Sequence, residues 1–371
     1  MGRIDSDVLE RFAALTLAET GTERAVAETV AASLVGADLR GHPSHGVQLI
    51  PDYFEWAFDG HLVPEASHEV VADRGATVHV DGNHAFGHAV ARAATDLAID
   101  RVTEGGHPSV TVGLRKATHI GRVGWFAEQA AEAGLGFVGF TNMTSGDPVA
   151  PAGSAERRFG TNPLTFGLPG FDALDHDVVM DMATSQVAYG KVNVRQMAGK
   201  ADSIDPEWTV DEAGEPVLDP DEFNEEERGA LAPLGGQTAG YKGTGLMLVA
   251  ELFAATWSDS PVTPQSGSRY ENAAAFTVFD PLAFTSREAH EARLLALEEA
   301  LDETEYSEQV SAGTGTRADR AYLPGRVEHE VKTEYEREGI PVPERIRESL
   351  ADLAREHGVD EDAVSPVAPD P

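Results

Sequence analysis

The amino-acid sequence predicts a mixed fold of the α/β or α+β class, because helical and strand-like segments alternate along most of the chain. The stretch from Thr118 to Asn162 shows this alternation most compactly. It contains a glycine loop, an amphipathic segment, an apolar run from Leu135 to Phe140 and a glycine-rich turn. With 371 residues, the chain is long enough for a large core and more than one domain.

The first part of the chain is expected to be helical. Apolar residues recur at helical spacing from Asp5 to Thr20 and again after Thr22, which we interpret as the N-cap of a second helix. That helix is expected to stop at Gly41, and a third helix to run from about Val47 to Phe58.

The middle of the chain predicts strands with intervening helices. Val70–Ala72 and Ala76–Val80 flank a turn sequence and read as a hairpin. The elements expected after it are a helix over Ala85–Val102, a strand over Ser109–Leu114, the Thr118–Asn162 stretch, a buried strand over Asp177–Asp181 and a helix holding Tyr189, Gly190 and Lys191.

The chain changes character at residue 201. Residues 201–237 are acidic, rich in Pro and Gly and weakly periodic, so we expect a long surface excursion. The remaining elements expected are helices over Thr244–Trp257, Ser286–Glu303, Gly325–Glu338 and Glu344–His357, and a strand over Ala273–Phe279. The tail from Val359 is acidic and Pro-rich and is expected to be disordered.

These elements suggest four segments. Residues 1–70 form an N-terminal helical part, and residues 71–285 form an α/β domain that includes the acidic excursion. Residues 286–358 contribute helices that pack with the N-terminal part, and residues 359–371 form the tail.

The charge balance excludes several kinds of partner. The formal charge is −35, from 63 acidic and 28 basic residues, and only five of the basic residues are lysine. A diffuse acidic excess of this kind is typical of a halophile's cytosolic protein, although an acidic protein from a mesophile is the alternative. Nucleic acid and anionic membranes are poor partners for such a chain.

The absence of cysteine excludes disulfides and thiolate metal sites. The sequence has no apolar run long enough for a membrane span and no Sec-type signal pattern at its start, so we expect a cytoplasmic protein.

The single G-x-G-x-x-G match is not a dinucleotide fingerprint. Gly134, Gly136 and Gly139 follow a helix and lie inside a strand pattern, whereas the fingerprint needs a strand before it and a helix after it. We interpret Gly134 as a helix C-cap. A nicotinamide cofactor, if bound, must therefore be held without a Rossmann loop.

The turn from Gly41 to Val47 allows two interpretations. His42 and His45 could form a metal pair, but Pro43 breaks the helix that would align them and no nearby carboxylate completes a ligand set. We therefore predict no metal site. The other interpretation is that Ser44 hydrogen-bonds and orients His45, which acts as a general acid or base.

His119 and Arg122 lie in a glycine loop that follows a strand. The end of a strand is where α/β enzymes place reactive groups, but His119 could equally be a structural loop histidine. The planar fork of Arg122 suits a substrate carboxylate or a cofactor phosphate, although Arg122 could also be one of many surface arginines.

Lysine placement is a further indication. In a chain that avoids lysine, Lys116, Lys191 and Lys242 lie within or beside glycine-bearing motifs. Lys242 is expected at the start of an apolar helix, a natural anion site. Chance placement of so few residues is the alternative.

Taken together, these motifs resemble the malate/L-lactate dehydrogenase family, which is unrelated to Rossmann-type lactate dehydrogenases. Within it, the pattern is similar to the hydroxycarboxylate dehydrogenase B branch, which also has Ile-Pro-x-Tyr, here Ile50 to Tyr53. The motifs that carry the resemblance are collinear: Gly41–Gly46, His119–Gly124, Val149–Pro151, Gly160–Pro163, Asp181–Ser185, Gly190–Val192 and Gly240–Gly243.

The resemblance implies an L-sulfolactate dehydrogenase-like, non-Rossmann fold with a mixed sheet and a flanking helical domain, and a homodimer with the active site near the subunit interface. It implies NAD or NADP as cofactor and His45, Ser44, His119 and Lys191 as catalytic residues. It also implies Arg122, Leu49 and Tyr53 as substrate-binding residues. The implied cofactor-binding residues are Gly121, Arg122, Val123, Asn162, Val179, Met180, Asp181, Met182, Ala183, Tyr241, Lys242, Asn272, Gly325, Arg326, Val327 and Glu328.

Two departures from the family pattern bear on the substrate. Leu49 stands where many members carry an Arg that holds the substrate carboxylate, and Arg122 is a candidate replacement. Lys191 stands where the cyclic-imine reductases of the family place Asp, which favours a ketone or alcohol substrate over an imine.

The sequence therefore predicts an NAD(P)-dependent oxidoreductase that interconverts a 2-hydroxy acid and a 2-oxo acid. The alternatives are a cyclic-imine reductase and a non-catalytic dinucleotide-binding homologue. The preference for NAD or NADP and the choice between His45 and His119 as the proton-transfer group stay open.

Overall fold

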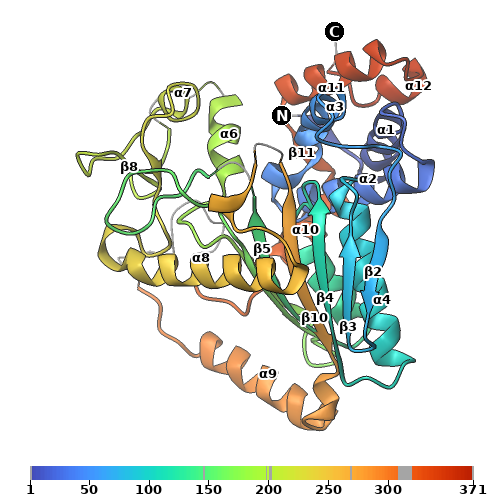
Figure 1. The fold of residues 1–371 in the computed structure, drawn as a ribbon, viewed down its shortest axis with the longest axis vertical. Helices are drawn as coiled ribbons and strands as arrows, with labels where there is room; N and C mark the ends of the chain where they lie inside the picture. Colours follow the sequence, from blue (N-terminus) through green and yellow to red (C-terminus); the bar gives the residue numbers. More distant parts are fainter. Residues whose placement is uncertain are drawn as a thin grey trace.

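A mixed sheet of seven strands lies at the centre of the molecule (Figure 1). The computed structural model describes residues 2–144, 147–197, 199, 203–267, 270–307 and 320–369, and the counts below refer to these residues. The strand order is β2 (Glu69–Asp73), β3 (Thr77–Asp81), β4 (Ser109–Ala117), β10 (Asn272–Phe279), β5 (Gly136–Met143), β6 (Leu164–Leu168) and β7 (Val178–Met182). Only β3 and β4 run parallel, and the other neighbouring pairs are antiparallel. The predicted mixed class is confirmed.

Helices cover both faces of this sheet. α4 (Gly87–Thr103) and α5 (Gly124–Glu132) pack on one face, and Phe126 and Phe276 belong to the buried apolar cluster between these layers. α8 (Gly236–Ser258) crosses the other face (Figure 1). Gly113 in β4 allows its close approach, because a Cβ there would overlap the carbonyl oxygen of Trp257.

The two ends of the chain meet in a helical part beside the sheet (Figure 1). Its elements are α1 (Ser6–Ala18), α2 (Arg24–Leu39), α3 (Ile50–Phe58), α10 (Arg326–Glu338), α11 (Glu344–Glu356) and α12 (Glu361–Val364), with β1 (Gly2–Ile4) paired to β11 (Ile340–Val342). They share one apolar cluster, in which Leu9, Leu34, Tyr53 and Leu350 are completely buried. The first 58 residues are thus held by chain that lies more than 250 residues further on.

The predicted surface excursion over 201–237 is wrong for the described residues from 203 onward. This segment contains β8 (Thr209–Val210), α7 (Pro220–Asn224) and β9 (Ala230–Leu231) and packs beside α6 (Tyr189–Met197). Ile204, Trp208, Val217, Phe223 and Leu231 form a small core of their own. Their irregular spacing fits neither helix nor strand periodicity, which is why the sequence pattern did not predict their burial.

The C-terminal helices do not all pack with the N-terminal part, as the sequence had predicted for residues 286–358. α9 (Arg287–Asp302) lies at the opposite end of the molecule (Figure 1). Its His290 ring hydrogen-bonds the carbonyl oxygen of Pro169 at 3.0 Å, and Arg287 pairs with Asp172 at 2.8 Å. These contacts hold α9 on the loop between β6 and β7. Short 3₁₀ turns occur at Thr263–Gln265 and Pro281–Ala283.

The prediction of a disordered tail is wrong for residues 359–369. α12 forms there, and Val364 and Val367 are completely buried in the cluster of the helical part. Arg347 donates a 2.7 Å hydrogen bond to the carbonyl oxygen of Val367. Val359 and Ala368 also pack against this cluster, so apolar side chains dock an otherwise acidic segment.

Most of the other predicted helices and strands are confirmed with small shifts at their ends, but α8 begins at Gly236 and not at the predicted Thr244. Gly134 follows α5 with a φ of +77°, so it acts as the predicted helix terminator and not as part of a dinucleotide loop. Thr22 is not an N-cap, because Glu23 holds that position without a side-chain hydrogen bond. β7 is a half-buried edge strand, not a buried one, and β1, β6 and β11 were not predicted. No helix among the described residues is long and apolar enough to cross a membrane.

Candidate active site

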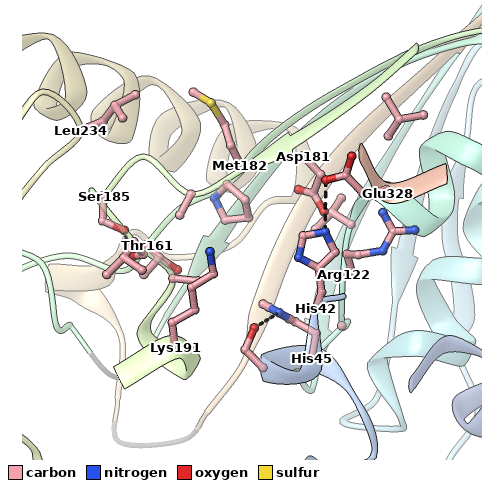
Figure 2. A pocket seen from close by; sticks show the side chains of 18 of the residues that line it. His42, His45, Arg122, Thr161, Asp181, Met182, Ser185, Lys191, Leu234 and Glu328 are labelled. Carbon is pink, nitrogen blue, oxygen red and sulfur yellow. Dashed lines mark hydrogen bonds and ion pairs between the residues drawn. The ribbon is translucent and has the colours of Figure 1, made fainter. Parts of the chain in front are cut away.

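Two cavities meet at Ser44 and His45, in the angle between the helical part and the sheet. The first, which we call the Lys191 cavity, is lined by Arg122, Asp181, Met182, Lys191, Gly325 and Glu328 among others (Figure 2). The second, which we call the Asp52 cavity, is lined by Leu49, Asp52, Trp56, His119, Arg157 and Tyr270 among others. Ser44, His45, Thr161 and Ala188 line both, so they form the wall between the cavities.

The loop that carries Ser44 and His45 is held tightly. It forms two short 3₁₀ turns, Pro43–His45 and Val47–Leu49, before α3 begins. The buried carboxyl of Asp38 accepts a 2.9 Å hydrogen bond from the backbone N–H of Val47, and burial raises its pKa to about 7. Asp38 lies so close to Gly46 that any side chain at position 46 would overlap it.

His45 is oriented by its neighbour in the chain. Its Nδ1 lies 3.1 Å from the Ser44 hydroxyl oxygen (Figure 2). Burial, with smaller contributions from the nearby His42, Arg122 and Lys191, lowers the pKa of His45 to about 4. The imidazole is therefore neutral near pH 7 and can accept a proton.

His119 is held from a distant part of the chain. Its Nδ1 lies 2.9 Å from the Tyr53 hydroxyl, which in turn lies 3.4 Å from Nε2 of His88. Burial lowers the pKa of His119 well below its usual range and that of His88 to about 3. The His119 ring stacks on His45 with centroids 5.7 Å apart. Two neutral imidazoles thus lie side by side at the wall between the cavities.

The Lys191 cavity contains both paired and unpaired cations. Arg122 is buried and pairs with Glu128 at 2.6 Å, and Glu128 also pairs with Arg40 at 2.8 Å. The Nε of Arg122 is buried without a hydrogen-bond partner. Lys191 reaches into the cavity from α6, opposite His42 and His45 (Figure 2). Among the described residues Lys191 has no ion-pair partner, and burial lowers its pKa.

Strand and helix ends form the rest of this cavity. Asp181, on β7, accepts a 2.6 Å hydrogen bond from the backbone N–H of Gly124 at the start of α5. Glu328, in the first turn of α10, lies 3.3 Å from Nε2 of His42. Burial opposes ionisation of Glu328, but the hydrogen bond and charge of His42 outweigh it and lower the pKa of Glu328. Gly325 has a φ of +96°, which favours glycine at this helix start.

The structure brings most of the predicted site residues together. Ser44, His45, Lys191, Gly121, Arg122, Val123, Val179, Asp181, Met182, Ala183, Gly325 and Glu328 line the Lys191 cavity, and Leu49 and His119 line the Asp52 cavity. Arg122 therefore lines the same cavity as the predicted cofactor-binding residues. It does not line the cavity of Leu49, the position at which many family members carry the Arg that Arg122 was predicted to replace.

Several other predicted residues lie elsewhere. Tyr53 is completely buried behind His119 and reaches neither cavity. Tyr241 and Lys242 are exposed on α8, and Tyr241 lines a different hollow beside Pro151. Asn162 and Asn272 are buried and hold backbone groups at the ends of β5 and β4. Met180, Arg326 and Val327 do not line either cavity; Arg326 pairs with Glu298 and Glu330, and Val327 packs on the helical core.

Sequence reasoning missed Glu128 and most of the Asp52 cavity. Leu49, Asp52 and Trp56 fall on one side of a helical repeat, a pattern that could have indicated a shared lining. Tyr270 carried no local signal, because it reaches the cavity from just before β10. Among the described residues, no three His, Asp or Glu side chains are grouped as a metal site.

Comparisons with known proteins point to one family of dehydrogenases. The family model described as malate/L-lactate dehydrogenase matches residues 4–351. Hydroxycarboxylate dehydrogenase B of Escherichia coli (strain K12) is 30% identical over 367 residues, which cover 98% of this chain and 96% of that protein. L-lactate dehydrogenase of Cupriavidus necator is 37% identical over 253 residues, 67% of this chain and 70% of that protein. The structure of sulfolactate dehydrogenase from Methanocaldococcus jannaschii superposes with a TM-score of 0.80 at 25% identity, covering 97% of this chain and 98% of the other.

Proposed function

This chain belongs to the malate/L-lactate dehydrogenase family, and we propose that it interconverts a 2-hydroxy acid and a 2-oxo acid by hydride transfer with NAD or NADP. The observation that carries the proposal is the position of Ser44 and His45 on the wall shared by two cavities. A group there can exchange a proton with a substrate in one cavity while the cofactor occupies the other.

The residues of the Lys191 cavity fit a dinucleotide. The buried Nε of Arg122 has no partner, and the start of α5 and the first turn of α10 both border the cavity, where the helix dipoles favour phosphate. We propose that Gly121, Arg122, Val123, Asp181 and Gly325 hold the cofactor here. When bound, its nicotinamide ring supplies C4 as the hydride donor or acceptor.

We assign the proton transfer to His45. In oxidation of a hydroxy acid, neutral His45 accepts the hydroxyl proton at Nε2. Nδ1 must then carry a proton and donate it to the Ser44 hydroxyl oxygen, 3.1 Å away, which keeps the ring oriented. His119 lines only the Asp52 cavity, so we propose that it positions the substrate and is the second candidate for the proton.

Lys191 supplies the positive charge. Its ammonium has no described ion-pair partner and lies across the cavity from His45, so it can hold the acid or stabilise the developing alkoxide. An ammonium at this position would repel the iminium carbon of a cyclic imine, so a ketone or alcohol substrate is favoured over the alternative imine-reductase reaction.

Oxidation of NADH and NADPH at molar KCl tests the proposal. The panel is pyruvate, oxaloacetate, 2-oxoglutarate, phenylpyruvate, sulfopyruvate and pyrroline-2-carboxylate. Turnover of any oxo acid supports the reaction class and identifies the preferred cofactor. Activity on the imine alone would replace the proposal with imine reduction. No turnover by folded protein would leave only a non-catalytic homologue.

We also propose a cytoplasmic homodimer adapted to high salt. The net charge of −35 supports the salt dependence, because screening reduces self-repulsion. α8 supports the dimer: Leu248, Val249, Leu252 and Phe253 are apolar yet between 38% and 57% exposed. Light scattering at molar KCl should give twice the chain mass of 39.5 kDa, and Leu252→Glu should shift it toward the monomer. A monomeric wild type would overturn the dimer.

A further inference from the structure

The carboxylate of Asp52 occupies an unusual position in the Asp52 cavity. Asp52 lies in the first turn of α3, and the residue after it, Tyr53, holds the ring of His119. The carboxylate lines the same cavity as His45 and His119, whereas Lys191 lines only the Lys191 cavity. A substrate held between Lys191 and His45 would therefore extend its side chain toward Asp52.

Asp52 is partly buried and unpaired. No hydrogen bond or ion pair joins its side chain to any of the described residues. Burial, together with the nearby charge of Glu55, raises the pKa of Asp52 to about 6. A carboxylate kept without a partner in a cavity is available to a ligand.

The walls around Asp52 are aromatic and apolar. The rings of Trp56 and Tyr270 stack with centroids 4.9 Å apart, and each lies 6.3 Å from the His119 ring. Tyr270 lines the same cavity as Asp52, and burial, together with the negative charge of Asp52, raises the pKa of its hydroxyl. Leu49 completes this side.

The other charged groups of the cavity do not offset Asp52. Asp147 and Glu227 add negative charge at its exposed rim. Among the described residues Arg157 is the one Lys or Arg that lines it. Its guanidinium already donates to the carbonyl oxygens of Gly229 and Phe223 and lies over the Phe223 ring at 4.4 Å. The cavity is therefore negative overall.

We propose that Asp52 determines substrate specificity: it selects hydroxy acids whose side chain carries a neutral hydrogen-bond donor or a positive charge, and it rejects acids with a second carboxylate. The inference rests on the proposed function. A distal N–H or O–H would donate to the Asp52 carboxylate, whereas a second carboxylate would be placed beside a like charge in a site with little water. Unpaired buried polar groups give strong discrimination of this kind.

L-malate and its 4-amide test the inference, because they differ only in the distal group. Both are assayed as substrates for oxidation, at molar KCl and at a pH well above the pKa of Asp52. We expect wild type to prefer the amide by about tenfold or more in kcat/KM. Asp52→Asn should lower kcat/KM for the amide, raise it for malate and bring the ratio close to one. Asp59→Asn, an exposed aspartate at the end of the same helix, should leave the ratio unchanged.

The outcomes separate the two proposals. Oxidation of both acids with equal kcat/KM, or a preference for malate, overturns the role of Asp52 while the proposed reaction stands; a malate preference lost in Arg157→Gln would assign the distal carboxylate to Arg157 instead. A ratio that Asp52→Asn does not move also overturns it. If neither acid nor any other hydroxy acid is oxidised, the proposed function fails and this inference fails with it.

Discussion

The Lys191 cavity and the Asp52 cavity share one wall but differ in how they are built. The Lys191 cavity is formed by glycine loops, strand ends and helix starts, with Arg122 and Lys191 as its cations. The Asp52 cavity is formed by aromatic side chains and carboxylates that come from separate parts of the chain. The contrast suggests that backbone geometry and positive charge serve the part of the site that any family member needs, while side chains alone set what is special to this protein's substrate.

Charge makes the contrast sharper. In a chain of net charge −35, anionic ligands need local positive groups, and these gather on one side of His45. The other side keeps the acidic character of the surface. Substitutions in each cavity test whether the Lys191 cavity and the Asp52 cavity have different roles, and the largest effect is expected at the wall that they share.

Replacing His45, on the wall shared by the two cavities, should cause the largest loss of activity. We expect His45→Gln to lower kcat by about 10²- to 10⁴-fold, the usual contribution of a general acid or base, with cofactor affinity changed by less than about threefold. His119→Gln should cause a smaller loss, mainly in KM. Steady-state kinetics and fluorescence titration with NADH measure both. If His119→Gln caused the greater loss in kcat, the proton-transfer role would belong to His119.

Removing the cation of the Lys191 cavity should have the next largest effect. Lys191→Gln removes a charge-assisted contact, so we expect kcat/KM to fall by about 10- to 100-fold. Lys242→Gln is the matched control, because Lys242 is exposed on α8, and it should change kcat/KM by less than about twofold. An equal loss in both variants would show that only the net charge matters.

Replacing Arg122 distinguishes a role in cofactor binding from a role in substrate binding. Because Arg122 lines the Lys191 cavity together with the proposed cofactor residues, Arg122→Ala should raise KM for the dinucleotide by about tenfold and destabilise the Arg40–Glu128 pair. KM for the 2-oxo acid should change little. A larger change in the KM of the oxo acid would instead support Arg122 as the group that holds the substrate carboxylate.

A substitution at Tyr53 tests whether its hydrogen bond holds the His119 ring in place. Tyr53→Phe removes the 2.9 Å hydrogen bond to Nδ1 of His119 inside the core, so we expect a loss of about 1–3 kcal/mol in the free energy of unfolding and a several-fold loss in kcat/KM. Urea titration at fixed KCl measures the first. Unchanged stability would mean that the bond does not hold the ring.

The loop between the cavities should show a pH dependence. The pKa of Asp38 is raised to about 7 in the folded protein, so the folded state binds more protons than the unfolded state above pH 4, and Asp38 destabilises the fold increasingly as the pH rises to 7. Asp38→Asn removes this effect. Its stability relative to wild type should rise by about 1–3 kcal/mol between about pH 5 and pH 7. A constant difference in urea titrations would contradict the raised pKa.

The sequence predicted the Lys191 cavity far better than the Asp52 cavity, for a physical reason. The backbone at Gly121, at Gly325 and in the Ser44–His45 turn has a local geometry that requires glycine or proline, and these residues can be recognised in the sequence. Asp52 and Tyr270 meet only through tertiary packing. Tyr53 was assigned to the substrate through the resemblance, and a motif does not show that its side chain is buried and holds His119.

The larger elements show the same limit. Most long periodic helices and strands were predicted within a few residues, the start of α8 excepted. The small core around Trp208 and the docked tail at Val364 were not predicted. In both, a few apolar side chains at irregular or short spacing find partners far away in the chain. The prediction that Tyr241 and Lys242 bind the cofactor is not supported for a related reason. Their position in a motif did not indicate that both side chains are exposed on α8.

A crystal structure with the dinucleotide and oxamate, an inert analogue of a 2-oxo acid, would test the two-cavity arrangement most directly. We expect the nicotinamide in the Lys191 cavity and the oxamate within hydrogen-bond reach of His45. The amide end of the oxamate should face Asp52. A dinucleotide bound in the hollow beside Tyr241, or an acid held away from His45, would contradict the account.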